Sequence, residues 1–185
     1  VLDAARLAGA TRVAVVTSAD IYGPVTEAEL PLTEQQPLRP VSPYAASKAA
    51  ADMLCVQAGL GHGFDVIRIR AFNHLGPGQS DKFVASALAR RVARAERNRE
   101  ATVRVGNLEA RRDFTDVRDV VRAYRALMVD GCPGQAYNVC SGIDRSVREL
   151  AGILLRTSSA DITLETDPEL MRPVDLKVLR GDNTK

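Results

Sequence analysis

The sequence has few of the residues that build metal sites and disulfide frameworks. It contains three cysteines, far apart in the chain, and two histidines that do not cluster with them. An odd number of separated cysteines without a Cys-x-x-Cys pair indicates neither a disulfide framework nor a zinc site. We therefore expect no metal, and a reducing, cytoplasmic environment is the simplest fit to this cysteine usage.

Long apolar runs and a large charge imbalance are also lacking. No segment has the length and apolarity of a membrane-spanning helix, and no secretory signal is visible. The formal net charge of +2 gives no electrostatic argument for nucleic acid or a membrane surface as a partner. The arginine-rich residues 90–99 are better interpreted as the solvated face of an amphipathic helix. With 45% hydrophobic residues in 185, the chain can bury a globular core.

One glycine motif is missing as well. No Gly-x-Gly-x-x-Gly follows a predicted strand, and the run Gly59–Gly63 follows a helix and indicates a turn. Dinucleotide-binding folds use such a loop to hold the pyrophosphate at a helix N-terminus. The chain starts at Val1 within a predicted helix end that stops at Gly9. We therefore expect it to begin inside a fold and to lack most of a cofactor pocket.

Strands and helices alternate along the chain, which predicts an α/β fold with a parallel sheet. The expected strands are 12–17, 66–71, 102–105, 135–140 and 161–165. The expected helices are 43–57, 81–96, one that begins near residue 116, and 146–156, where Ser146 and Glu149 form a capping box. We expect loops at 24–40, 72–79 and 171–185. The elements after residue 76 are shorter and more mixed, as in a smaller lobe joined to the sheet.

The stretch from Ser42 to Lys48 carries the clearest chemical signal. Ser42 is a good helix N-cap, Pro43 suits the first helical position, and the alanine-rich run behind them favours helix. Tyr44 and Lys48 should therefore lie on one face of a helix, one turn apart. A neighbouring ammonium favours the phenolate form of a tyrosine, so the pair is a candidate general acid and base. An ordinary surface pair is the alternative interpretation.

A second segment strengthens this interpretation. The strand 13–18 ends in two hydroxyl residues, and Tyr22-Gly23 follows it. Together with the Tyr44-x-x-x-Lys48 helix, this pattern resembles the extended short-chain dehydrogenase/reductase family, whose members work on nucleotide sugars. The resemblance implies a Rossmann-like doubly wound parallel sheet, incomplete here because about the first third of a full-length enzyme is absent, and NAD or NADP as the cofactor.

The resemblance also implies roles for the catalytic residues. Ser18 would hold the substrate oxygen and Tyr44 would pass the proton. Lys48 would favour the Tyr44 phenolate and bind the nicotinamide ribose, and Phe72 would help to bind the cofactor. We expect residues 1–75 to form the C-terminal part of the cofactor domain. Residues 76–185 would form mainly the substrate lobe, with segments around 115–142 returning to the sheet domain.

Arginines in two separate segments indicate the substrate. Arg112 and Arg172 could clamp a diphosphate, because each guanidinium can bind phosphate oxygens bidentately, although either could be a surface ion pair. The segments 72–79, 105–117, 137–142 and 181–183 resemble the GDP-mannose branch of the family, and its reductases more than its dehydratases. The resemblance implies that a GDP-sugar is bound by Ser18, Asn73, Asn107, Arg112, Arg172 and Asp175.

The implied reaction is hydride transfer from NADH or NADPH to the C4 ketone of GDP-4-keto-6-deoxy-mannose, giving GDP-D-rhamnose. Dehydration would need a further acid/base pair, typically Thr and Glu near Ser18; the Asp20 found there is shorter than Glu by one methylene, which favours the reductase. A dehydratase of the same branch, another nucleotide-sugar epimerase, and a non-catalytic nucleotide-binding relative or inactive fragment are the alternatives. A hydrolase triad is disfavoured because no Gly-x-Ser-x-Gly is present and the loop pattern explains His74.

Relatives commonly pair through sheet-domain helices, so we expect a homodimer for the full-length protein.

Overall fold

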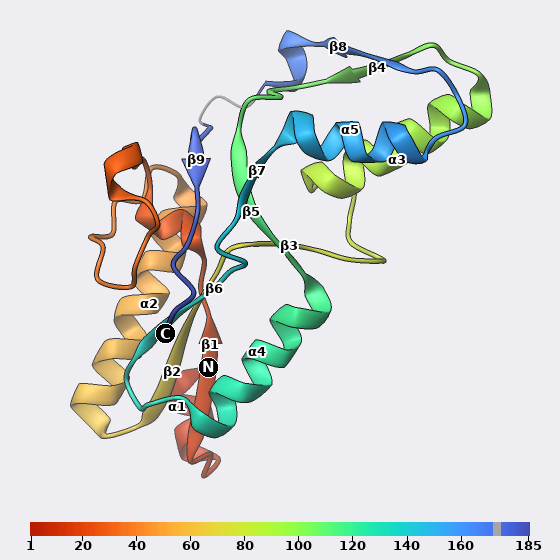
Figure 1. Cartoon of the computed structure of the whole chain (residues 1–185). Helices are drawn as coiled ribbons and strands as arrows, with labels where there is room; N and C mark the ends of the chain where they lie inside the picture. Colours follow the sequence, from red (N-terminus) through yellow and green to blue (C-terminus); the bar gives the residue numbers. More distant parts are fainter. Residues whose placement is uncertain (172–174) are drawn as a thin grey trace.

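A computed structural model describes residues 1–171 and 175–185, with a sheet unit and a smaller lobe joined by a narrow ribbon of strands (Figure 1). The helices are α1 (Leu2–Leu7), α2 (Pro43–His62), α3 (Val84–Asn98), α4 (Val117–Asp130) and α5 (Val147–Thr157). The strands are β1 (Arg12–Val16), β2 (Asp65–Ala71), β3 (Asn73–Leu75), β4 (Thr102–Val105), β5 (Arg111–Asp116), β6 (Ala136–Val139), β7 (Asp144–Ser146), β8 (Thr163–Thr166) and β9 (Val178–Leu179). Short 3-10 helices are η1 (Ala19–Tyr22), η2 (Glu27–Glu29) and η3 (Pro168–Leu170).

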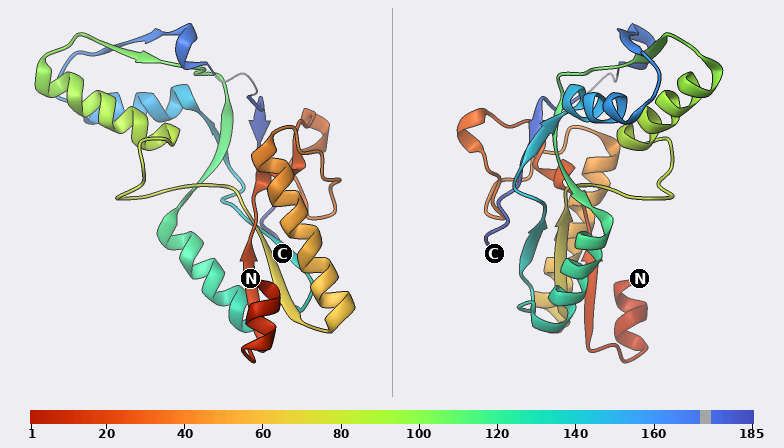
Figure 2. Two further views of the ribbon diagram at one scale, coloured as in Figure 1. Left: turned by 180° about the vertical axis from the view of Figure 1, so that it is seen from behind. Right: turned by 45° about the vertical axis from the view of Figure 1, so that its right-hand side comes forward.

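The sheet unit contains three parallel strands in the order β1-β2-β6. Helices α2 and α4 lie on opposite faces of this sheet (Figure 2). Side chains of the central strand β2 alternate between the two faces. Ile67 and Ile69 pack against α4, whereas Arg68 and Arg70 extend to Asp52 of α2. The expected α/β class with a parallel sheet is confirmed.

The smaller lobe has a core of its own. β4 and β8 pair in parallel, and α3 and α5 pack together beside them (Figure 1). Helix α3 buries Leu88 and Val92 and exposes Arg90, Arg94 and Arg97, so the arginine-rich stretch is the solvated face that the amphipathic pattern predicted. The buried core residues of the lobe are Leu88, Val92, Ala95, Val103, Val105, Leu108, Ala110, Val147, Ala151 and Ile162.

The ribbon that connects the sheet unit to the lobe is a small sheet of the strands β3, β5, β7 and β9. β5 pairs with β3 and β9 in parallel and with β7 in antiparallel orientation. Asp113, in the middle of β5, is fully buried, and its carboxylate accepts hydrogen bonds from Ser141 N (2.7 Å), Ser141 Oγ (2.6 Å), Gly142 N (2.9 Å) and Gly181 N (3.3 Å). This one carboxylate therefore ties the β6–β7 loop and the C-terminal segment to the ribbon.

Two sequence predictions were wrong in detail. Helix α2 continues through Gly59 to His62, because the residue of the glycine run that caps it is Gly63, at a left-handed φ of 62°. Strands β3, β5, β7 and β9 lie in segments where we expected no strand. β5 lacks the apolar alternation that identifies a strand because its inward-facing positions carry charges, such as Asp113, that are paired only in the folded chain. Within the described residues, no helix combines the length and apolarity needed to cross a membrane.

Candidate active site

The N-terminus of α2 presents Tyr44 at the carboxyl end of the sheet. Ser42 caps the helix by accepting a hydrogen bond from Ala45 N at 3.1 Å, and Pro43 occupies the first turn, as predicted. Tyr44 therefore lies in the first turn, and 53% of its surface is exposed. The other three tyrosines, Tyr22, Tyr124 and Tyr137, are buried or half-buried, so the phenol that a substrate can approach most directly is that of Tyr44.

Lys48 lies one turn below Tyr44 and connects the helix to the sheet. Its Nζ donates to the carbonyl oxygen of Val16, the last residue of β1, at 3.3 Å. The same Nζ is 5.9 Å from the centre of the Tyr44 ring. An ammonium has three N–H donors, so the bond to Val16 leaves it capacity to bind a ribose hydroxyl and the Tyr44 oxygen.

Ser18 follows β1 at the same edge of the sheet. It is buried, and its Oγ accepts a hydrogen bond from Asp20 N at 3.2 Å, so that it caps η1. Helix α2 contacts η1 directly. A hydroxyl that accepts a bond can still donate its own proton. Capping the turn and holding a substrate oxygen are therefore compatible roles for Ser18.

Three of the residues expected to bind substrate meet on one side of the lobe. Arg112 Nη2 lies 2.6 Å from Asp175 Oδ1, and Asn107 Nδ2 donates to Asp175 Oδ2 at 2.9 Å. Asn107 Oδ1 in turn accepts from Glu109 N at 3.0 Å. Asp175 thus holds the guanidinium and the amide of two side chains from different segments in fixed orientations. Such an arrangement suits bidentate recognition of a phosphate.

The remaining expected residues fall in three places. Asn73 is the first residue of β3, opposite Phe114 of β5; because strand side chains alternate, it shares a face with Arg112. Phe72 is buried and packs on Tyr22, with 6.3 Å between ring centres, so its side chain belongs to the core, and its role toward the cofactor stays a prediction. Arg172 lies outside the described residues.

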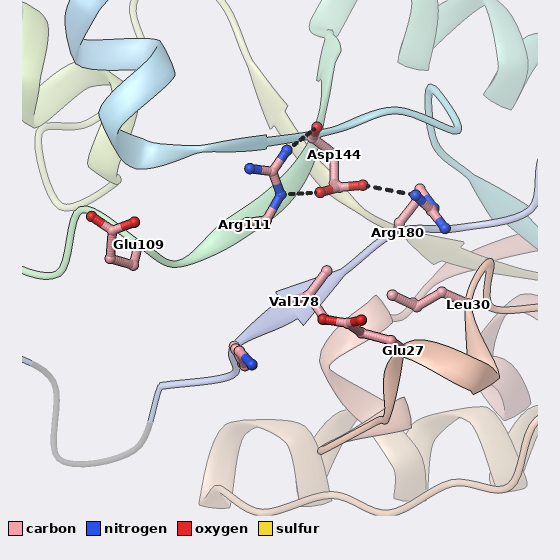
Figure 3. Close-up of a pocket in the computed structure, with 8 residues that line it drawn as sticks. Glu27, Leu30, Glu109, Arg111, Asp144, Val178 and Arg180 are labelled. Carbon is pink, nitrogen blue, oxygen red and sulfur yellow. Dashed lines mark hydrogen bonds and ion pairs between the residues drawn. The ribbon is translucent and has the colours of Figure 1, made fainter.

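A cavity of about 350 Å³ opens on the opposite face of β5 (Figure 3). Arg111 and Arg180 both bond Asp144 there, Arg180 with 3.2 Å between Nη1 and Oδ1. Burial would raise the pKa of Asp144, but the two guanidiniums hold it below its ordinary value. The lining residues are Glu27, Leu30, Glu109, Arg111, Asp144, Lys177, Val178 and Arg180. None of the predicted site residues that the structure describes lines this cavity, so it is distinct from the face that carries Arg112.

A buried polar network that was not predicted from the sequence lies beneath Tyr44 and Lys48. Asp52 is fully buried and bonds both Arg68 and Arg70, and Arg70 also donates to the Tyr22 hydroxyl at 3.2 Å. Burial raises the pKa of Tyr22 to about 12, although Arg70 opposes this shift. The available signal was the spacing, because Asp52 follows Lys48 by one further helical turn.

Comparisons with known proteins identify the family. The family model for GDP-mannose 4,6 dehydratase matches residues 1–185. The GDP-6-deoxy-D-mannose reductase of Pseudomonas aeruginosa is 41% identical over 92% of this chain and 56% of its own length. The dTDP-glucose 4,6-dehydratase of Streptomyces griseus is 34% identical over 86% of this chain and 47% of its own length. The chain thus spans about half the length of the curated relatives it matches.

Solved structures agree with this assignment. RMD from Pseudomonas aeruginosa in complex with NADPH has a TM-score of 0.90 and 39% identity, covering 98% of this chain and 61% of that one. The UDP-glucose 4-epimerase of Thermus thermophilus in complex with NAD has a TM-score of 0.84 and 28% identity, covering 98% of this chain and 58% of that one. The fold is therefore Rossmann-like, as the resemblance implied. The chain belongs to the GDP-mannose 4,6-dehydratase family of nucleotide-sugar enzymes.

Proposed function

We propose that the full-length protein reduces the C4 ketone of GDP-4-keto-6-deoxy-mannose to GDP-D-rhamnose, with NADH or NADPH as the reductant. The observation that carries the proposal is the position of Lys48, whose ammonium bonds the end of β1 and lies beneath the Tyr44 ring. Identity of 41% with a GDP-6-deoxy-D-mannose reductase supports the choice of substrate.

The residues present fit a nicotinamide dinucleotide. Tyr44 is half-exposed, and the Lys48 ammonium is held at the carboxyl end of β1, the edge where open α/β sheets bind ligands. The bound cofactor would supply the hydride. Lys48 would hold the nicotinamide ribose and favour the Tyr44 phenolate after proton transfer.

The chain's own residues would complete the reduction. As negative charge develops on the C4 oxygen, the Ser18 hydroxyl would donate a hydrogen bond to it and Tyr44 would donate the proton, so that charge is neutralised as it forms. Arg112 and Asn107, oriented by Asp175, would fix the diphosphate end of the substrate, and Asn73 would bond it from the adjacent strand.

The second candidate is a GDP-mannose 4,6-dehydratase, because that family's model matches the whole chain. Dehydration requires a second acid/base group to remove the C5 proton and release the C6 hydroxyl. Asp20 is the residue near Ser18 that could supply one, and its short side chain favours the reductase.

The test uses the full-length protein. It is mixed with GDP-4-keto-6-deoxy-mannose and NADPH or NADH, and nicotinamide absorbance and product mass are followed. We expect cofactor oxidation in the wild type, a loss of roughly 10²-fold or more in kcat for Tyr44→Phe, and little change for Tyr124→Phe, a half-buried tyrosine of α4 that packs on β2. If the protein instead removes water from GDP-mannose without net cofactor oxidation, the reductase proposal is wrong and the protein is a dehydratase.

A further inference from the structure

Tyr44, Lys48 and Asp52 form a line on α2, each one turn below the last. Tyr44 is half-exposed, Lys48 is partly buried, and Asp52 is fully buried between the helix and the sheet. The line therefore runs from the surface of the active site into the protein. A buried charge at its lower end requires an explanation, because burying an unpaired carboxylate costs several kcal/mol.

Two arginines of β2 neutralise this carboxylate. Arg68 Nη1 lies 2.7 Å from Asp52 Oδ1, Arg70 Nε lies 3.0 Å from Oδ2, and Arg70 Nη2 lies 3.1 Å from Oδ1. Burial alone would raise the pKa of Asp52, but these hydrogen bonds and charges keep it below its ordinary value, so the group is ionised near neutral pH. Arg70 makes a bidentate pair, which fixes direction as well as distance.

The network continues to the turn that Ser18 caps. The hydroxyl of Thr17, the residue before Ser18, has one proton to donate, and two acceptors lie within its reach: Ile69 O at 3.1 Å and Asp52 Oδ2 at 3.5 Å. Arg70 donates to the hydroxyl of Tyr22, the last residue of η1, at 3.2 Å. Asp52 is thus linked to both ends of the short segment that carries Ser18.

Apart from the bond from Lys48 to Val16 O, few buried side chains fix the register of α2 against the sheet. Besides Asp52, its buried side chains are those of Ala45, Cys55 and Ala58, which are small. Small side chains interlock weakly, so apolar packing alone gives little resistance to sliding or rotation of the helix. The best-supported role of a buried polar or charged group is to fix the register of one element against another. Here, that register is the position of Tyr44 and Lys48 relative to Ser18.

We propose that Asp52 is a positioning residue: through Arg70, Arg68 and Thr17 it fixes the height and rotation of α2, and thereby the geometry between Tyr44 and Ser18. The inference rests on the proposed roles of Ser18, Tyr44 and Lys48. A displacement of about 1 Å at a reacting group can cost about 10²-fold in rate, so a modest change of helix register would be visible in kcat.

The experiment compares Asp52→Asn with Asp65→Asn in the full-length enzyme, using whichever nucleotide-sugar reaction the wild type performs. Asp65 is the control, because this carboxylate also pairs with an arginine, Arg12 of β1 at 2.6 Å, but it lies at the first residue of β2, the end of the strand away from Tyr44. We expect Asp52→Asn to lower kcat by about tenfold or more with KM changed by less than about threefold, and Asp65→Asn to leave kcat within about twofold.

A double-variant comparison separates positioning from simple destabilisation. When Tyr44→Phe has already removed the proton donor, Asp52→Asn should lower the residual rate by less than about twofold, because the group it positions is gone. An equal loss in both backgrounds, or an unchanged kcat in Asp52→Asn alone, would overturn the proposal. If Asp52→Asn does not fold, Arg70→Lys, which keeps the charge and loses the bidentate geometry, is compared in the same way. Failure of the proposed reductase function shows in the wild-type reaction itself, whereas failure of this inference shows only in the ratios between variants.

Discussion

Arg112 and Asp175 lie 63 residues apart in the chain, and their side chains form an ion pair with 2.6 Å between Nη2 and Oδ1. The Arg112 side chain is 12% exposed, so the pair is largely shielded from water. Asp175 also accepts a hydrogen bond from the Asn107 side-chain amide. The guanidinium is therefore held in one orientation, which would lower the entropy cost of binding a diphosphate in the role proposed for Arg112.

Neighbouring arginines on β5 give a matched test of diphosphate binding. Arg112→Lys keeps the charge but cannot bind phosphate oxygens bidentately, so we expect the KM for the GDP-sugar to rise about tenfold. Arg111 faces the opposite side of the strand, where it bonds Asp144, and Arg111→Lys should leave KM nearly unchanged. Steady-state kinetics of the two variants decide the matter, and equal increases in KM would rule out the assignment to Arg112.

The buried carboxylate of Asp113 should be important for stability. Asp113→Asn keeps the shape but replaces an acceptor with a donor that faces N–H groups of Ser141, Gly142 or Gly181. We expect the free energy of unfolding to fall by about 1–3 kcal/mol. Glu165→Gln, at an exposed position of β8, should change it by less than about 0.5 kcal/mol. Chemical denaturation measures both, and similar values for the two variants would contradict the expectation.

Gly23 should tolerate no side chain. It has a φ of 67°, and an added Cβ would lie 1.7 Å from the carbonyl oxygen of Arg39. We expect Gly23→Ala to cost at least about 3 kcal/mol. Gly134 has a similar φ of 73° with nothing within 4 Å of the added Cβ, so Gly134→Ala should cost only about 1 kcal/mol. The difference between their unfolding free energies measures the extra cost at Gly23, which combines the steric clash with a backbone at φ 67° and ψ −151° that essentially only glycine adopts.

Acid should destabilise the protein partly through Asp52. Arg70 and Arg68 outweigh the effect of burial and hold the pKa of Asp52 below its ordinary value of 3.8. A carboxyl group whose pKa is lower in the folded state stabilises the fold above the unfolded pKa, and this contribution disappears as the pH falls through the folded pKa. We expect the wild type to lose stability below about pH 4, and Asp52→Asn to show a shallower slope there. Urea unfolding across this pH range measures both, and parallel curves would exclude the contribution.

Short sequence patterns predicted the features that depend on neighbouring residues alone, such as helix caps. The caps of α2 and α5 are where Ser42 and the Ser146–Glu149 capping box indicated. The class of fold and the family also followed from short motifs. The spacing along α2 places Asp52 on the same helix face as Lys48, but no local pattern says that the arginines of β2 face Asp52 rather than solvent, so the network itself could not be predicted. β5 was missed for a related reason, since its charges are paired by residues distant in the sequence.

The ribbon between the sheet unit and the lobe restricts how the two can move. β3 follows β2 after the single residue Phe72, α4 follows β5 with no residue between them, and β3 and β5 are hydrogen-bonded to each other. Two paired strands resist stretching and sliding within their plane far more than they resist bending out of it. We therefore expect the lobe to move by flexing this ribbon about one axis, which structures of the full-length protein with and without a nucleotide sugar would reveal. Because Asn73 and Arg112 both lie on the ribbon, such a motion would change their distance from Tyr44 while keeping their distance from each other.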